Sequence, residues 1–232
     1  MDIRAIILDI DGTLVDTNPA HVEAWRRTFQ RFGYDVPADR IVVEIGKGGD
    51  KLIPSVLGQE VEEREGEALR KAQKKEFLAI AESERFPVFP GVEELFQALR
   101  ERSIRSALAT SSDEKHLEAT LASAGLDLRE LADVVVTRSP NEASKPAPDL
   151  VLAAIEELRL PAQQCAMIGD TVYDGQACQA AGVVFLGVLT GPATEDELIQ
   201  AGARAVWRDV AHLLTEIDRA LDIASATVAA SE

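Results

Sequence analysis

Two aspartates follow the first apolar segment of the chain. Asp9 and Asp11 come directly after the apolar run at residues 5–8 and are separated by one residue. Side chains at positions i and i+2 of an extended segment lie on the same side, so both carboxylates can address one substrate group from different distances. One carboxylate can attack as a nucleophile while the other moves protons to and from the leaving group. This spacing predicts a carboxylate pair whose members have different tasks.

Further polar residues follow three later apolar runs. They are a threonine with a serine beside it, a lysine and two more aspartates: Thr110, Ser111, Lys145, Asp170 and Asp174. If these runs are neighbouring parallel strands, the polar side chains converge on the sheet edge that carries the aspartate pair. Four carboxylates around one lysine repel each other, so either some of them are neutralised or a cation is bound. A hard divalent ion is the natural solution, because Mg²⁺ prefers oxygen ligands and bridges carboxylates to phosphate. The pattern predicts phosphoryl chemistry, with the threonine, serine and lysine on the phosphoryl oxygens.

The elements that must position these residues alternate between strand and helix after residue 86. Short apolar runs predict strands at residues 4–9, 105–109, 133–137, 165–168, 183–188 and 205–207. Amphipathic stretches between them predict helices, the last at residues 210–221. Regular alternation is typical of a parallel sheet with helices on both faces, because right-handed crossovers place helices there. We therefore expect an α/β fold with a Rossmann-like parallel sheet as its core.

Residues 17–85 differ from the rest of the chain. A helix N-cap at Asn18 and a charged helical run at residues 62–84 predict helices, with little strand signal between them. This segment holds 12 Lys and Arg against 13 Asp and Glu, so its net charge is near −1, whereas that of the remainder is near −15. We expect residues 17–85 to form an α-helical cap domain, inserted into a catalytic core of residues 1–16 and 86–232.

The composition argues against several kinds of partner. A net charge of −16 disfavours nucleic acid, because neutralising phosphates needs basic patches. There is no run of about 18 apolar residues, and charged residues come too early for a signal peptide, so we expect a cytoplasmic protein without membrane contact. Cys165 and Cys178 stand in apolar contexts and are expected to be reduced core residues. No pattern fixes an oligomeric state.

In order and spacing, four motifs resemble those of the haloacid dehalogenase superfamily of phosphohydrolases. They are DIDGTLVD at residues 9–16, ALATSS at 107–112, SKPAPD at 144–149 and GDTVYD at 169–174. The resemblance implies that Asp9 is the nucleophile and a Mg²⁺ ligand. It also implies that Asp11 is the general acid and base, with its backbone carbonyl on the metal.

The same resemblance assigns the remaining motif residues and the cap. It implies that Thr110 and Lys145 hold the phosphoryl group and that Asp170 ligates Mg²⁺. Asp174 would ligate the metal through water or orient its ligands. The superfamily also places a helical cap between the first motif and the second strand, which corresponds to residues 17–85. The phosphoglycolate phosphatase and β-phosphoglucomutase-like branch is the one that this arrangement resembles.

Three cap residues are candidates for contact with the substrate. Sugar-phosphate mutases and phosphatases of the superfamily can have a histidine where His21 stands, although a surface or capping histidine is an equal alternative. Residues 46–51 resemble a loop that closes over the substrate in related enzymes, where Lys47 or Lys51 can meet an anion. The alternative is a glycine turn between helices. His116 stands in an ordinary helical context, for which we expect no special role.

These residues favour a magnesium-dependent phosphatase that hydrolyses a small phosphorylated metabolite through an aspartyl-phosphate. Dehalogenases of the superfamily lack the second aspartate, so Asp11 argues against that activity. Mutases of the β-phosphoglucomutase type share SKPAPD and the cap histidine, but typically have Val or Ile in place of Thr13 and Glu in place of Gly169. A phosphoryl-accepting signalling domain of the receiver type has about half this length and no helical insertion. Phosphoglycolate, sugar phosphates and nucleotides all remain open as substrates.

Overall fold

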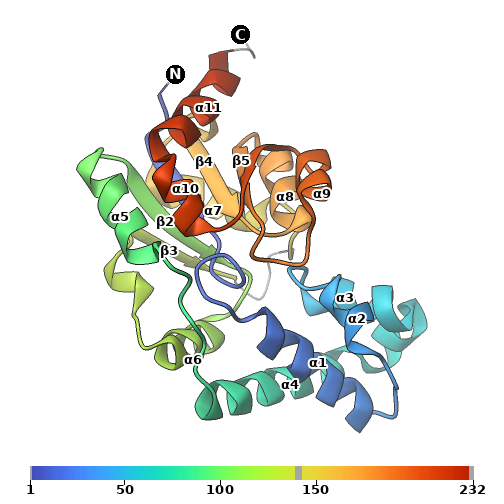
Figure 1. Ribbon diagram of the computed structural model, residues 1–232. Helices are drawn as coiled ribbons and strands as arrows, with labels where there is room; N and C mark the ends of the chain where they lie inside the picture. The colour runs from blue at the N-terminus through green and yellow to red at the C-terminus, as the bar shows by residue number, and fades with distance from the viewer. Residues whose placement is uncertain (1, 139–142, 230–232) are drawn as a thin grey trace.

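The computed structural model describes residues 2–138 and 143–229 and has a six-stranded parallel sheet at its centre (Figure 1). The strands lie in the order β3-β2-β1-β4-β5-β6, and each neighbouring pair is parallel. Their bounds are β1 (Ala5–Leu8), β2 (Arg105–Thr110), β3 (Val134–Thr137), β4 (Cys165–Gly169), β5 (Val184–Val188) and β6 (Ala203–Trp207). This order confirms the Rossmann-like α/β fold, and each predicted strand is present within two residues of its expected bounds.

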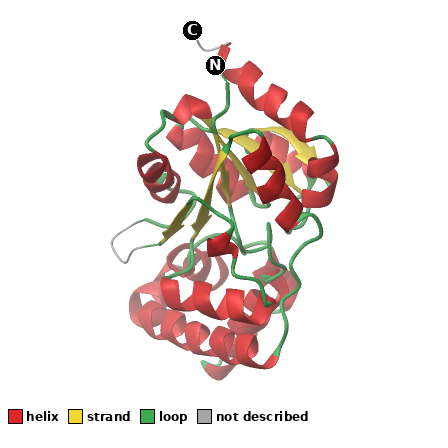
Figure 2. Ribbon diagram, turned by 90° about the vertical axis from the view of Figure 1, so that its left-hand side faces the viewer, coloured by secondary structure: helices red, strands yellow, loops and turns green. Residues whose placement is uncertain are grey.

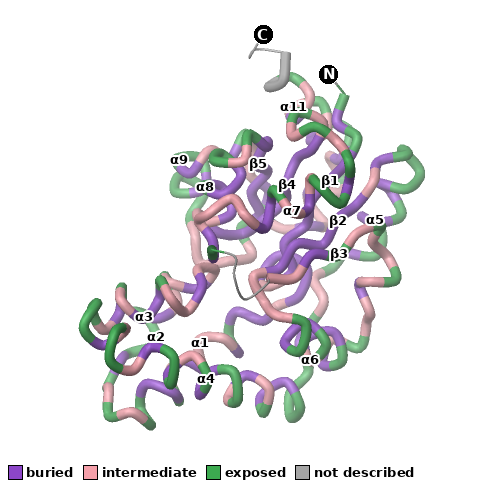
Figure 3. The backbone as a smooth tube through the Cα atoms, turned by 180° about the vertical axis from the view of Figure 1, so that it is seen from behind, coloured by how far each residue is buried: buried purple, intermediate pink, exposed green. Residues whose placement is uncertain are grey.

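Helices cover both faces of the sheet because both faces are apolar. Alternate residues of β1 enter different layers: Ile6 and Leu8 pack in one core cluster, Ala5 and Ile7 in the other. Helices of the first layer are α5 (Val92–Glu101), α6 (Glu114–Ala124), α10 (Val210–Thr215) and α11 (Ile217–Ala229). Helices of the second layer are α7 (Asp149–Leu158), α8 (Val172–Ala181) and α9 (Glu195–Gln200). Figure 3 shows mostly buried residues along the central strands, whereas the edge strands β3 and β6 each include an exposed residue.

The last predicted helix, at residues 210–221, is in fact two helices. The first ends at Thr215 and the second begins at Ile217. Glu216 lies at the break and accepts a hydrogen bond from Trp207 Nε1 at 3.0 Å. Both helices keep their apolar residues in the first layer, so the amphipathic pattern continues across the break and conceals it in the sequence.

The first four helices after β1 form a separate layer beside the carboxyl ends of the strands (Figures 1 and 2). They are α1 (Asn18–Arg31), α2 (Ala38–Val42), α3 (Gly49–Leu57) and α4 (Gln59–Ser83), and we call them the cap. The cap has its own apolar cluster around Trp25, Phe29 and Ile53, whereas Phe77 and Ile80 of α4 join the core cluster. Among the described residues, no helix is long and apolar enough to span a membrane.

The entrance to the cap differs slightly from the expectation. Helix α1 begins at Asn18, so the N-cap position belongs to Thr17 and the prediction of Asn18 was one residue late. The Thr17 hydroxyl makes no capping bond and instead donates to Asp11 Oδ1 at 2.9 Å. The two connections between core and cap lie side by side, since Asp16 N donates to Pro87 O at 2.8 Å.

Candidate active site

Asp9 occupies the first position after the central strand. Its backbone N–H donates to Ile168 O of β4 at 3.1 Å, and its side chain is buried. The chain then turns at Gly12, whose φ of +83° is strained for other residues. A Cβ at Gly12 would also lie 2.4 Å from Asp170 Oδ2. Glycine therefore lets the first motif fold back against the fourth.

Lys145 lies between two buried carboxylates. Its ammonium is 2.5 Å from Asp9 Oδ1 and 2.6 Å from Asp174 Oδ1. Burial alone would lower the pKa of Lys145, but Asp174 and Asp9 hold this pKa well above its ordinary value. Burial, with Asp174, Asp170 and Asp11 nearby, raises the pKa of the Asp9 carboxyl in spite of the lysine. One ammonium therefore does not balance the negative charge at this edge of the sheet.

Asp170 completes the carboxylate cluster. It is fully buried and accepts hydrogen bonds from Thr13 Oγ1 at 2.8 Å and from Asn18 Nδ2 at 3.2 Å. Burial, and then the charge of Asp174, raises the pKa of Asp170 to about 7. Asp174 belongs to the capping box of α8 with Thr171, which fixes its position.

The cluster has the chemistry of a magnesium site. Asp9, Asp170 and Asp174 each offer a carboxylate oxygen, and these oxygens lie within 4.8 Å of one another. Asp174 Oδ1 is buried and pairs with the Lys145 ammonium, and no other group of the described residues donates to it, so it retains ligand capacity. Hard oxygen donors with surplus negative charge suit Mg²⁺, so the residues present fit the metal expected from the sequence.

Magnesium binding is expected to stabilise the fold measurably. At a Mg²⁺ concentration 100 times its Kd, the free energy of unfolding should rise by about 2.7 kcal/mol, because the ion binds the folded state. The Asp170→Asn variant should lose most of this increase, since it removes a ligand while keeping the side-chain volume. Urea unfolding with Mg²⁺ and with a chelator measures both. Equal stabilisation of the wild type and the variant would contradict the assignment of Asp170 as a ligand.

Asp11 is surrounded by hydrogen-bond donors. Thr17 Oγ1 donates to Oδ1 at 2.9 Å, while Thr110 and Ser112 hydroxyls donate to Oδ2 at 2.9 and 3.2 Å. His21 Nε2 lies 3.4 Å from Asp11 Oδ1. Burial alone would raise the pKa of Asp11, but His21, Thr17 and Thr110 hold this pKa well below its ordinary value. Asp11 is therefore ionised in this arrangement.

The two predicted phosphate-binding hydroxyls lie differently. Thr110 is fully buried and donates its hydroxyl to Asp11, whereas Ser111 lines the cleft. Ser112 also lines the cleft and was not predicted. In this arrangement Thr110 orients the second aspartate, and its contact with a phosphoryl group stays a prediction.

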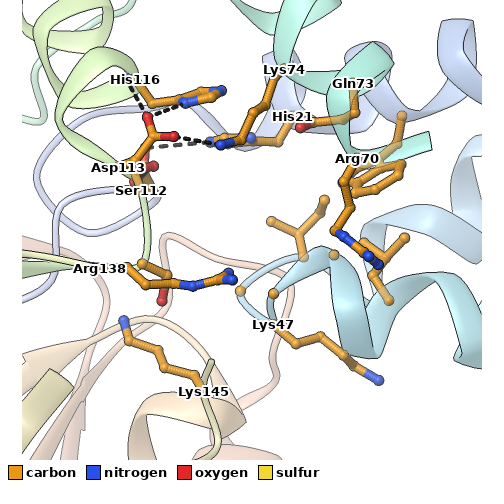
Figure 4. Close-up of a pocket in the computed structure, with 18 of the residues that line it drawn as sticks. His21, Lys47, Arg70, Gln73, Lys74, Ser112, Asp113, His116, Arg138 and Lys145 are labelled. Carbon is orange, nitrogen blue, oxygen red and sulfur yellow. Dashed lines mark hydrogen bonds and ion pairs between the residues drawn. The ribbon is translucent and has the colours of Figure 1, made fainter. Parts of the chain in front are cut away.

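A cleft of about 520 Å³ separates the sheet edge from the cap (Figure 4). His21 lines this cleft and stacks on Phe77, with ring centroids 4.3 Å apart. His116 lies in α6, the helical context expected for it, and it also lines the cleft. Its Nδ1 lies 2.7 Å from Asp113 Oδ1, and Lys74 of the cap donates to Asp113 Oδ2 at 2.5 Å. Asp113 thus connects core and cap at one side of the cleft.

The cleft contains further residues that the motifs did not indicate. They are cap and core side chains that include Trp25, Arg70, Gln73, Lys74 and Arg138. Arg70 and Lys74 are four residues apart and share one face of α4, a spacing visible in the sequence. Which face of that helix meets the cleft depends on how α4 packs, and the sequence pattern does not give this.

The glycine-rich segment at residues 46–51, whose last three residues form the start of α3 rather than a loop, packs against the core. A Cβ at Gly46 would lie 2.5 Å from the Thr171 side chain, and a Cβ at Gly48 would lie 2.4 Å from that of Ser144. Asp50 accepts a hydrogen bond from Ser144 Oγ at 2.8 Å. The segment therefore contacts the residue before Lys145, and its closing over a substrate stays a prediction.

The two lysines of this segment do not present their ammonium groups to the carboxylate cluster. Lys47 lines the cleft, but its ammonium pairs with Glu44 and donates to Ser55 Oγ at 2.9 Å, and Figure 4 shows it directed away from Lys145. Lys51 is exposed, lies 3.8 Å from an Asp50 oxygen and is not among the residues that line the cleft. A role for either lysine with substrate remains a prediction.

Gly48→Ala is expected to weaken substrate binding without unfolding the protein. Overpacking at such a contact costs about 1–3 kcal/mol, so KM should rise about 5- to 150-fold if cap docking is needed for binding. Gly58→Ala is the control, because a Cβ there meets nothing within 4 Å, but the backbone φ is +94°. It should lower the melting temperature and leave KM unchanged. A Gly48→Ala protein with wild-type KM would show that this contact does not matter for binding.

The sheet, the carboxylate cluster at its carboxyl edge and the helical cap define a class of capped α/β hydrolases. The chain belongs to the haloacid dehalogenase-like hydrolase family, whose pattern matches residues 3–182. This finding confirms the resemblance seen in the motifs. It also removes the support for a non-enzymatic signalling domain.

Individual relatives agree with this placement. The chain is 29% identical over 231 residues to the phosphorylated carbohydrates phosphatase of Thermotoga maritima, covering 93% of this chain and 100% of that protein. A hydrolase from Pseudomonas syringae has a crystal structure that matches with a TM-score of 0.85 and 28% identity, covering 94% and 99% of the two chains. SUPPRESSOR OF QUENCHING 1, chloroplastic, of Arabidopsis thaliana is 30% identical over 213 residues, and the match spans 91% of this chain but 20% of that protein.

Proposed function

We propose that this protein is a magnesium-dependent phosphatase that hydrolyses a small phosphomonoester through an aspartyl-phosphate on Asp9. The observation that carries the proposal is the pairing of two unlike carboxylates at the end of β1. Asp9 lies against Lys145 in the carboxylate cluster, whereas Asp11 is held by hydroxyl and imidazole groups at the edge of the cleft. One group is suited to attack and the other to proton transfer.

In the first step an Asp9 oxygen attacks phosphorus, and the bond from phosphorus to the leaving oxygen breaks. Asp11 delivers a proton to that oxygen. Asp11 must carry a proton for this step, and His21 Nε2 lies 3.4 Å from its Oδ1. In the second step Asp11 takes a proton from water, which attacks phosphorus, releases phosphate and restores Asp9. Lys145 offsets negative charge on the nucleophile and phosphoryl oxygens throughout.

Asp9, Asp170 and Asp174 would hold the magnesium ion, together with the backbone carbonyl of Asp11 that the family resemblance implies. When bound, the ion would supply positive charge that draws the phosphoryl oxygens to the carboxylates. The relatives named as phosphatases support a phosphomonoester as the substrate class. A cytoplasmic location remains part of the proposal.

The direct test is phosphate release by the purified protein. We expect hydrolysis of p-nitrophenyl phosphate and of at least one metabolite in a panel of phosphoglycolate, sugar phosphates and nucleotides. A chelator should stop the reaction and added Mg²⁺ should restore it. Absence of phosphate release from every ester, by protein that is folded and supplied with Mg²⁺, would overturn the proposal.

A sugar-phosphate mutase is the second candidate. His21 beside Asp11 favours it, since the histidine does lie at the cleft. Gly169 disfavours it, because mutases typically have Glu at this position. A Cβ at Gly169 would lie 2.7 Å from Asp174 Cγ, so this arrangement has no room for a glutamate side chain. Isomerisation of glucose 1-phosphate to glucose 6-phosphate at a rate above phosphate release would identify a mutase instead.

A further inference from the structure

The Arg70 side chain lines the cleft and is held in place by its neighbours. In sequence, Arg70 lies outside all four motifs. Its Nη1 donates to Glu62 Oε1 at 2.5 Å, and Glu62 is eight residues earlier on the same helix. Glu62 can reach that far because the residue between them is Gly66, where a Cβ would lie 2.3 Å from Glu62 Oε2. A glycine inside a helix is unfavourable, so its presence here has a structural reason.

A second glycine makes room for the stem of the same arginine. A Cβ at Gly49 would lie 2.9 Å from Arg70 Cγ and 3.0 Å from a ring carbon of Trp25. The Arg70 side chain therefore extends from α4 past Gly49, the first residue of α3, and the Trp25 ring lies close to the same glycine. Within the described part of the chain, Glu62 is its one recorded hydrogen-bond partner, so most of its five N–H donors are left for a ligand.

Cationic side chains gather in this half of the cleft, although the protein as a whole is acidic. Apart from the catalytic carboxylates and Lys145, the described residues that line it include Lys47, Arg70, Lys71, Lys74 and Arg138 against Glu67 and Asp113. Lys47 is paired with Glu44 and Lys74 with Asp113, so the remaining cations of the lining are Arg70, Lys71 and Arg138. The whole chain has a net charge of −16. Glu62 is not among the lining residues, so it neutralises Arg70 from behind and orients it.

We propose that Arg70 binds a second anionic group, carried by the leaving-group part of the substrate. Arg138 of the core also lines the cleft, and Figure 4 shows its guanidinium directed toward the cap, where Nη1 lies 4.0 Å from Asp50 Oδ1. The substrate class is then a phosphomonoester whose alcohol portion bears a carboxylate or a second phosphate, with its scissile phosphate at Asp9. This inference rests on the proposed phosphatase function. A second-anion site makes monophosphates of uncharged sugars poor substrates.

The test compares matched pairs of substrates that differ in the second anion. The carboxylate pair is phosphoglycolate and 2-hydroxyethyl phosphate, and the phosphate pair is a hexose bisphosphate and the corresponding hexose monophosphate. In at least one pair, we expect kcat/KM to be about tenfold or more higher for the member that carries the second anion. One charge-assisted hydrogen bond supplies enough binding free energy for this difference. The pair that shows the preference identifies which anion is recognised.

The variants assign that preference to Arg70. Arg70→Gln should reduce the anionic-to-neutral ratio about tenfold, mainly through KM, whereas Arg70→Lys should reduce it less. If Arg70→Gln alone folds poorly, the double variant Glu62→Gln/Arg70→Gln replaces it, because it leaves no unpaired carboxylate. The double variant should show the same reduced ratio. Arg64→Gln is the matched control, because it removes an exposed arginine of the same helix that pairs with Glu65. It should keep the wild-type ratio.

The outcomes separate this inference from the proposed function. Hydrolysis of p-nitrophenyl phosphate with a ratio of one or less in both pairs would overturn the second-anion site and leave the phosphatase standing. A wild-type preference that survives in Arg70→Gln would overturn the role of Arg70. No hydrolysis of any ester would overturn both.

Discussion

Asp9→Asn is expected to reduce kcat for p-nitrophenyl phosphate by at least about 10⁴-fold, as loss of a covalent nucleophile does in other hydrolases. The carboxamide keeps the shape of the side chain but is a poor nucleophile, so the aspartyl-phosphate does not form. The measurement is phosphate release at saturating Mg²⁺ and substrate, with acid-quenched protein tested for bound phosphate. The wild type should yield an acid-stable phosphoprotein and Asp9→Asn should not.

Asp16→Asn is the matched control for that experiment. Asp16 belongs to the same short acidic segment, but it lies at the entrance to the cap and lines a different pocket from Asp9. The control should retain activity close to that of the wild type. If Asp9→Asn also retained activity and labelling, Asp9 would not be the nucleophile, and another carboxylate of the cluster would have to be considered.

Lys145→Met is expected to affect both activity and stability. The ammonium is buried between Asp9 and Asp174, and removing one partner of a buried ion pair costs about 3–5 kcal/mol because the remaining charge is unpaired. In a chelator the free energy of unfolding should fall by about this amount. Activity should fall at least about 10³-fold, since the phosphoryl oxygens also lose a charge-stabilising donor. Urea unfolding and steady-state kinetics measure the two effects.

Two further variants make the Lys145 result specific. Lys75→Met removes an exposed lysine of α4 and should leave unfolding and activity unchanged. Lys145→Met/Asp174→Asn removes one of the two unpaired carboxylates and should recover part of the lost stability, while activity stays low. Unchanged stability of Lys145→Met in the chelator would mean that the cluster is not held together by this ion pair.

The sequence by itself was enough to find the catalytic edge. Apolar runs that each end in a chemically active residue are short-range features, and parallel strands bring their carboxyl ends to one edge whatever the details of packing. Asp9 and Asp170 directly follow the neighbouring strands β1 and β4. Asp174 lies in the first turn of α8, and Lys145 lies before α7, yet both reach the same cluster. The inserted helices were also readable from their period and charge.

Tertiary structure alone decided which groups those residues contact. Thr110 turns its hydroxyl to Asp11, and His116 reaches the cleft through the packing of α6 against the cap. The position of the Arg70 side chain depends on its packing against Gly49 and on the rotation of α4 about its axis. Neither feature has a local sequence pattern. Periodicity gives the apolar face of a helix but not what its polar face meets, because that depends on how distant segments dock. The proposed phosphoryl chemistry was therefore visible in the sequence, whereas the proposed recognition of the leaving group required the fold.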